Sequence, residues 1–121
     1  MRHTIRGLII QNKKVLLVTG HGADFYWTPG GGIETDETAE QTLRREIGEE
    51  LGVTIKTLTP YSSYDYEDQK VENYLIEIEG AIVPGSEITG TVWYSSALSL
   101  NTSNGLKDMV LPHLLTDGLI E

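Results

Sequence analysis

Acidic side chains gather in one short stretch of this sequence, at a spacing that could bring several carboxylates to one metal ion. Seven of the 18 acidic residues fall within the seventeen positions from Glu34 to Glu50. On a helix with about 100° between successive residues, Glu46, Glu49 and Glu50 share an arc of about 100°. Like charges at these spacings repel by roughly 0.2–0.5 kcal/mol per pair, and the C-terminal end of a helix is the wrong end for acids. The cluster is therefore either a solvated acidic face or a site for chemistry.

The ligand chemistry of these residues favours a divalent cation. Three carboxylates on one helix face supply the hard oxygen ligands that Mg²⁺ or Mn²⁺ prefers, and such an ion binds phosphate oxygens and activates water. Arg45, one helical turn before Glu49, could pair with it and limit the repulsion. The run Pro29-Gly30-Gly31-Gly32 ahead of the helix lets the backbone approach an ion or ligand closely, so a loop carbonyl could complete the coordination.

Composition limits the classes of protein to consider. A length of 121 residues with 39% hydrophobic and 22% charged residues predicts one globular domain over residues 1–121. The lack of cysteine excludes disulfide scaffolds, thiol catalysis and cysteine zinc sites. A net charge of −9 argues against a nucleic-acid duplex as partner but not against small phosphorylated ligands that bind through cations. The apolar runs are too short to span a bilayer and the N-terminus has no apolar signal-peptide core, so we expect no membrane association and a cytoplasmic location.

Hydrophobic patterning predicts the elements that must position the acidic cluster. A helix is expected from Asp36 to Leu51, capped by Thr35 or Asp36 and ended by Gly52. Strands are expected over residues 4–10, 15–19, 53–58, 62–66, 71–79 and 91–94, with a short β-favouring run at 25–28 and a glycine loop at 30–32. These elements predict an α/β fold with a mixed sheet between helices.

A second helix is expected from Asn104 to about Leu115, bent or broken by Pro112. Its apolar stripe would consist of Leu106, Met109, Val110 and Leu114. The two helices would then cover the sheet.

The order of residues around the acidic cluster resembles a known family motif. The chain reads Gly31, five residues, Glu37, seven residues, Arg45-Glu46-Ile47, one residue, Glu49-Glu50, one residue and Gly52-Val53. This resembles, without a mismatch, the Nudix box, here at residues 31–53, and the small single-domain MutT-type members in particular. The resemblance implies a Nudix-type α/β/α sandwich with a mixed β-sheet. It also implies Mg²⁺-dependent hydrolysis, with Mn²⁺ as a possible substitute, of a nucleoside diphosphate linked to another moiety.

The resemblance assigns roles position by position. Glu46, Glu49, Glu50 and the Gly30 carbonyl match the metal ligands of the family. Glu46 also matches a residue proposed as general base in some members, and Arg45 matches the arginine that orients the glutamates. Glu37 matches a structural residue of the box.

Further site residues lie outside the box. Glu87, six residues before Trp93, is the candidate for an additional catalytic carboxylate, with Glu72 and Glu77 as rivals. Arg6 is a candidate phosphate ligand, as are His21 and Lys107. Tyr26, within the aromatic run at 25–27, could stack on a base, and Asn104 could pair with a purine edge or simply cap a helix.

The substrate class is inferred by elimination. Signatures of the ADP-ribose, coenzyme A and NADH subclasses are missing, so a nucleoside or deoxynucleoside triphosphate, cleaved to monophosphate and pyrophosphate, is the expected substrate. The alternatives are an ADP-ribose, dinucleoside polyphosphate or nucleotide-sugar hydrolase, and a non-catalytic nucleotide sensor that retains the fold. Homodimers are frequent in the family, although no residue here identifies an interface.

Overall fold

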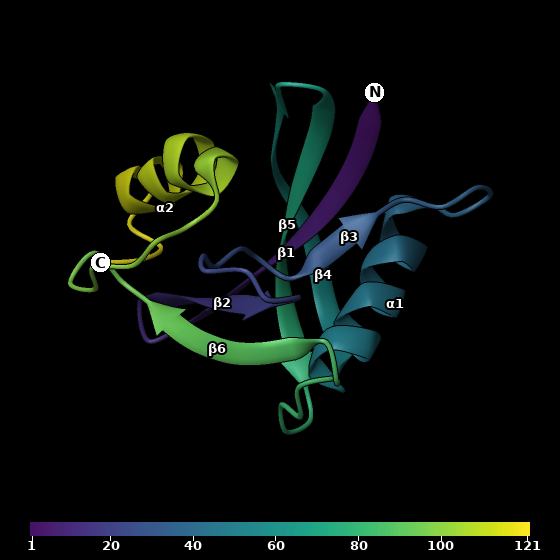
Figure 1. Cartoon of the computed structure of the whole chain (residues 1–121), viewed down its shortest axis with the longest axis horizontal. Coiled ribbons are helices and arrows are strands. Elements are labelled where there is room, and N and C mark those ends of the chain that lie inside the picture. The colour runs from purple at the N-terminus through teal and green to yellow at the C-terminus, as the bar shows by residue number, and fades with distance from the viewer.

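The computed structural model describes residues 1–121 as a mixed sheet with helices on both sides (Figure 1). The elements in chain order are β1 (Arg2–Gln11), β2 (Lys14–Gly20), β3 (Gly30–Gly32), α1 (Ala39–Leu51), β4 (Thr54–Tyr66), β5 (Gln69–Glu79), β6 (Ile88–Tyr94), the π-helical turn η1 (Leu106–Val110) and α2 (Leu111–Thr116). This arrangement confirms the predicted α/β/α sandwich. No helix is long and apolar enough to cross a membrane.

The sheet is organised around β1, which has a different partner at each part of its length. The strand order is β4-β5-β1-β2-β6, and β3 pairs separately with β1. One edge of β1 pairs in parallel with β5 from Arg2 to Ile9, while the other edge pairs with β3 at Thr4–Arg6 and with β2 only at its last two residues. The sheet therefore opens between β1 and β2, and Figure 1 shows β2 and β6 crossing the other strands steeply.

Helix α1 begins later than the sequence suggested. Asp36 has a positive φ of 68°, which does not suit a helix cap, whereas Thr38 is extended and its side chain accepts the Gln41 amide. The Thr38 amide in turn donates to the Gln41 side-chain oxygen, which completes a capping box. The prediction of Thr35 or Asp36 as cap is therefore wrong. The C-terminal prediction is confirmed, since Gly52 adopts the left-handed conformation and its amide bonds the Gly48 carbonyl.

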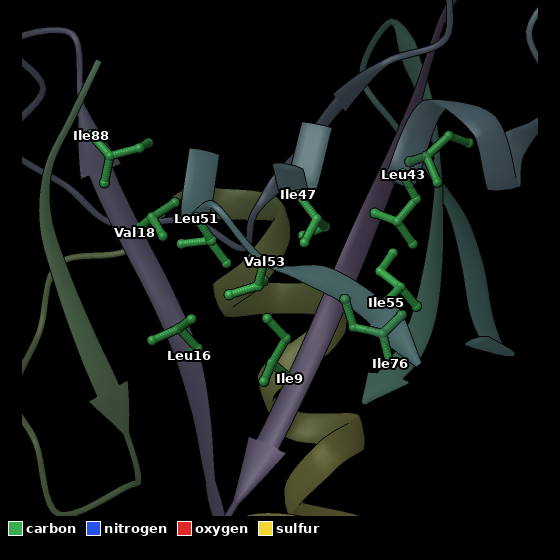
Figure 2. Packing of buried hydrophobic residues seen from close by; sticks show 11 residues of the cluster. Ile9, Leu16, Val18, Leu43, Ile47, Leu51, Val53, Ile55, Ile76 and Ile88 are labelled. Atoms are coloured by element: carbon green, nitrogen blue, oxygen red, sulfur yellow. The ribbon is translucent and has the colours of Figure 1, made fainter. Parts of the chain in front are cut away.

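Two hydrophobic clusters fill the two faces of the sheet. On one face Leu43, Ile47 and Leu51 of α1 are fully buried against strand residues such as Ile9 and Val18 (Figure 2). On the other face the C-terminal helical segment packs its apolar residues onto Leu8, Val15 and Leu17. Leu106, Val110 and Leu114 are buried as expected, but Met109 is 42% exposed, because the π-helical turn rotates it away from the stripe.

The backbone differs from the sequence prediction at three further places. Gly30–Gly32 forms β3 instead of a loop, and a side chain at Gly30 would lie 2.1 Å from the Ile5 carbonyl oxygen at a φ of +142°. Residues 54–66 form one strand, since the bulge next to Pro60 lies on an edge strand that tolerates proline. Pro112 does not break the C-terminal segment, because it sits in the first turn of α2, where its missing amide is not needed.

Candidate functional site

The acidic cluster opens into a groove at the junction of β3, α1 and the segment 85–88. This acidic groove has a volume of about 520 Å³. Its lining includes Glu46, Glu49 and Glu50 of α1, all three glycines of β3, Glu87, the cationic side chains of Arg2 and Arg6, and His21. The structure thus brings together every residue that the sequence analysis assigned to metal binding.

Arg45 connects two acidic side chains of the segment 31–53, Glu37 and Glu46, by hydrogen bonds. Its Nε and Nη2 donate to the two oxygens of Glu37, at 2.7 and 3.0 Å, and its Nη1 donates to Glu46 Oε1 at 2.7 Å. Glu37 also accepts the Glu34 amide and the Thr42 hydroxyl. The hydrogen bonds from Arg45 and Glu34 lower the pKa of Glu37 to about 2, and Glu37 in turn raises the pKa of Arg45. Arg45 thus joins Glu37 and Glu46 by direct hydrogen bonds to both carboxylates.

Glu46 and Glu50 form the most crowded pair of acids in the groove. Burial raises the pKa of Glu50 to about 8, and a hydrogen bond and charge repulsion from Glu46 act in the same direction. The Gly30 amide donates to Glu50 Oε2 at 3.2 Å, and no cationic side chain forms an ion pair with Glu50. Gly31 borders the Glu46 carboxylate so closely that a Cβ at Gly31 would lie 2.6–2.8 Å from its atoms. The backbone of β3 therefore shapes the space around both carboxylates.

The side chains differ in one respect from the expected convergence of three carboxylates. No group of three acidic or histidine side chains is arranged to hold a metal ion as it stands. The Glu49 side chain is 61% exposed and lies 3.7 Å from Arg45 Nη1, the same nitrogen atom that donates to Glu46. The donor set nevertheless fits a hard divalent cation, because Glu46 and Glu50 form a partly buried pair of carboxylates of which only Glu46 has an ion-pair partner, Arg45.

Glu87 lies in the acidic groove, whereas its two rivals do not. Its side chain is 75% exposed and faces His21 Nε2 at 3.7 Å across the groove rim. Glu72 instead contacts His3 and accepts a bond from the Tyr74 hydroxyl, and Glu77 accepts the Thr57 hydroxyl. Of the three acids, only Glu87 is in a position to act on a molecule bound in the groove.

A second, aromatic cavity adjoins the acidic groove. It has a volume of about 410 Å³, and Arg6 and Trp27 line both spaces. Its other walls include Phe25, Tyr64, Tyr66 and Asn104. Tyr64 and Tyr66 are two residues apart on β4, and this strand spacing was the signal that could have placed them on one face.

Of the two residues expected to contact a base, Asn104 lines the aromatic cavity and Tyr26 does not. Tyr26 does not line either space, because its ring packs against the hydrophobic cluster beneath the C-terminal helix. Strand alternation instead directs its neighbours Phe25 and Trp27 to the cavity, with their ring centroids 5.4 Å apart. Asn104 lies in the cavity wall, while Lys107 lines neither the groove nor the cavity.

Comparisons with known proteins agree with this geometry. A family model described as NUDIX domain matches residues 1–104. The oxidized purine nucleoside triphosphate hydrolase of Danio rerio is 40% identical over 63 residues, which cover 50% of this chain and 40% of that protein. The 8-oxo-dGTP diphosphatase of Escherichia coli (strain K12) is 33% identical over 66 residues, which cover 50% of this chain and 51% of that protein. The chain spans about half the length of these curated relatives.

The structural match is more extensive. A structure of MutT, from a study of Aliivibrio salmonicida and Vibrio cholerae, superimposes with a TM-score of 0.82 over 96% of this chain and 98% of that one. The sequence identity is 20%, so this likeness shows the fold.

Proposed function

The chain belongs to the Nudix family, and from this premise we propose that it hydrolyses nucleoside or deoxynucleoside triphosphates to a monophosphate and pyrophosphate in a Mg²⁺-dependent reaction. The observation that carries the proposal is the continuity of the two spaces, which meet at Arg6 and Trp27. An aromatic cavity suits a nucleobase, and an adjoining groove of carboxylates suits a metal-bound phosphate chain.

The carboxylates of the groove would hold the cation. Glu46, Glu49 and Glu50 are the side-chain ligands, and the Gly30 carbonyl is the backbone ligand. When bound, Mg²⁺ neutralises phosphate oxygens and lowers the pKa of coordinated water. Because the protein carries a net charge of −9, a bare triphosphate would be repelled, so the cation also controls substrate binding.

The remaining groups orient the reactants and move the proton. Arg45 fixes the Glu46 carboxylate by its bond to Oε1, which limits the number of orientations that carboxylate can adopt. Two carboxylates of the groove can accept the proton of the attacking water, Glu46 of α1 and Glu87 of the segment 85–88. Asn104, in the cavity wall, offers both a donor and an acceptor to a base edge.

The names of the relatives guide the choice of nucleotide. The Danio rerio relative is named for oxidized purine nucleoside triphosphates and the Escherichia coli relative for 8-oxo-dGTP. A purine triphosphate, ordinary or oxidised, is therefore the first substrate to examine.

The test is release of phosphate or pyrophosphate from a nucleotide panel, with and without Mg²⁺. The panel contains ordinary and oxidised triphosphates, ADP-ribose, diadenosine polyphosphates, nucleotide sugars and NADH. We expect turnover of triphosphates that falls at least about 100-fold in Glu50→Gln. Glu40→Gln is the matched control, because Glu40 lies on the same helix but pairs with Arg44 outside the groove.

Two results would contradict the proposal. Full activity of Glu50→Gln would show that Glu50 is not a required metal ligand. A wild-type protein that binds nucleotides but hydrolyses no member of the panel would identify a nucleotide sensor that retains the family fold.

A further inference from the structure

Two of the four arginines, Arg2 and Arg6, have no carboxylate partner, and of these two only Arg6 lines both the acidic groove and the aromatic cavity. Arg44 pairs with Glu40 at 3.0 Å and Arg45 pairs with Glu37 at 2.7 Å. Arg6 forms no ion pair within 4.0 Å, and its hydrogen bond is a single one, from Nη1 to the Thr28 carbonyl at 3.0 Å. In a chain with a net charge of −9, a guanidinium left unpaired next to a groove is available to an anion from outside the protein.

The position of Arg6 is equally specific. Its side chain lines both the acidic groove and the aromatic cavity. Burial lowers the pKa of Arg6, while the nearby Glu50 carboxylate opposes that shift. The guanidinium is therefore desolvated, and an arginine side chain keeps its charge in proteins. A desolvated guanidinium binds a phosphate more strongly than one exposed to water does.

We propose that Arg6 is a positioning residue that binds the phosphate group nearest the nucleoside, so that the nucleoside occupies the aromatic cavity while the remaining phosphates lie in the acidic groove. This inference rests on the proposed function, because it assumes a nucleotide bound across both spaces. The argument is one of placement: the part of a nucleotide that joins base and sugar to the phosphate chain must pass the wall that the two spaces share. The only charged side chain on that wall is Arg6.

A purely structural role for Arg6 gives different expectations. Its bond to Thr28 could serve only to fix the segment before β3, and its removal would then disturb the aromatic cavity as a whole. Such a disturbance would lower the affinity for a nucleoside and the affinity for its monophosphate by the same factor. Phosphate binding by Arg6 instead changes only the ratio of the two affinities.

The experiment is calorimetric binding of GMP, AMP and the corresponding nucleosides at a fixed Mg²⁺ concentration, which needs no turnover. We expect the wild-type protein to bind the monophosphates more tightly than the nucleosides by about 10- to 100-fold, the range for a hydrogen bond to a charged group. In Arg6→Ala this preference should be lost with nucleoside affinity unchanged, and Arg6→Lys should recover part of it.

Arg44→Ala is the matched control. Arg44 also donates to a backbone carbonyl at 3.0 Å, that of Ile55, but it lies outside both spaces. The substitution removes the same charge and a similar bond, so it should leave the preference for monophosphates intact.

The inference is overturned if Arg6→Ala keeps the preference for monophosphates, or if its affinities for nucleoside and monophosphate fall by the same factor. It is also overturned if the wild-type protein binds no monophosphate. Failure of the proposed function is a separate result, since it would appear as a lack of hydrolysis across the nucleotide panel with the binding data unaffected.

Discussion

A methyl group added at Gly31 tests how closely β3 controls the position of Glu46, a proposed metal ligand and proton acceptor. A Cβ at this position would lie 2.6 Å from Glu46 Cδ and 2.7 and 2.8 Å from its two oxygens, whereas ordinary contact begins at 3.4 Å. The carboxylate of Glu46 must therefore retreat by about 0.8 Å, away from the position in which Arg45 holds it. A displacement of about 1 Å in a catalytic group can cost about 100-fold in rate, so we expect kcat of Gly31→Ala to fall about 10- to 100-fold.

The assay is pyrophosphate release from the best triphosphate of the panel, measured beside the thermal stability of each variant. Stability should change by no more than about 1 kcal/mol, because the displaced group is the end of a flexible side chain. Gly32→Ala is the control on the same strand, since the nearest atom to its Cβ would be Arg2 Nε at 3.7 Å. Full activity of a well-folded Gly31→Ala would refute the role that we give to the fixed position of Glu46.

Three further predictions concern stability. The pKa of Glu37 falls from its ordinary 4.5 to about 2 in the folded state, so its stabilising contribution is complete above about pH 4.5 and is lost as the pH falls toward 2. The free energy of unfolding of Glu37→Gln should therefore depend less on pH between 4.5 and 2 than that of the wild-type protein. An unchanged pH dependence would contradict the pairing of Glu37 with Arg45. Leu51→Ala should lower the free energy of unfolding by about 2–5 kcal/mol in denaturant titrations, because Leu51 is fully buried between α1 and the sheet, and a loss below about 1 kcal/mol would be inconsistent with that packing. Gly48→Ala should raise the melting temperature by stabilising α1 by about 1 kcal/mol, since a Cβ there meets nothing within 4 Å, and a lower melting temperature would reveal a contact that this structure lacks.

The acidic groove was well represented in the sequence because its three helix carboxylates are close together in the chain. Glu46, Glu49 and Glu50 are fixed by helical periodicity, and Gly52 ends the helix where a left-handed residue was expected. The cap was misplaced because Thr35, Asp36 and Thr38 all offer a suitable oxygen, and only the backbone angles decide among them.

The aromatic cavity could not be predicted in the same way. Its walls come from positions near 25, 64 and 104, and only the pairing of β4 with β5 and the packing of the C-terminal segment bring them together. Strand alternation predicts that at least one of Phe25, Tyr26 and Trp27 points inward, but it does not decide between Tyr26 alone and the pair Phe25 and Trp27. The strand β3 was missed for a related reason, since three glycines have low strand propensity and pair only because β1 offers a free edge.

The separation of the two halves along the chain has a consequence for how such a protein can change. The three helix carboxylates that would perform hydrolysis come from one contiguous stretch, residues 31–53, whose internal bonds through Arg45 hold it in shape. The cavity that would select the nucleoside is lined by four separate segments of the chain that share none of those bonds. Mutation can therefore vary ligand preference while the hydrolytic apparatus is inherited intact, and a graft of new residues at positions 25, 64, 66 and 104 is the natural route to altered selectivity.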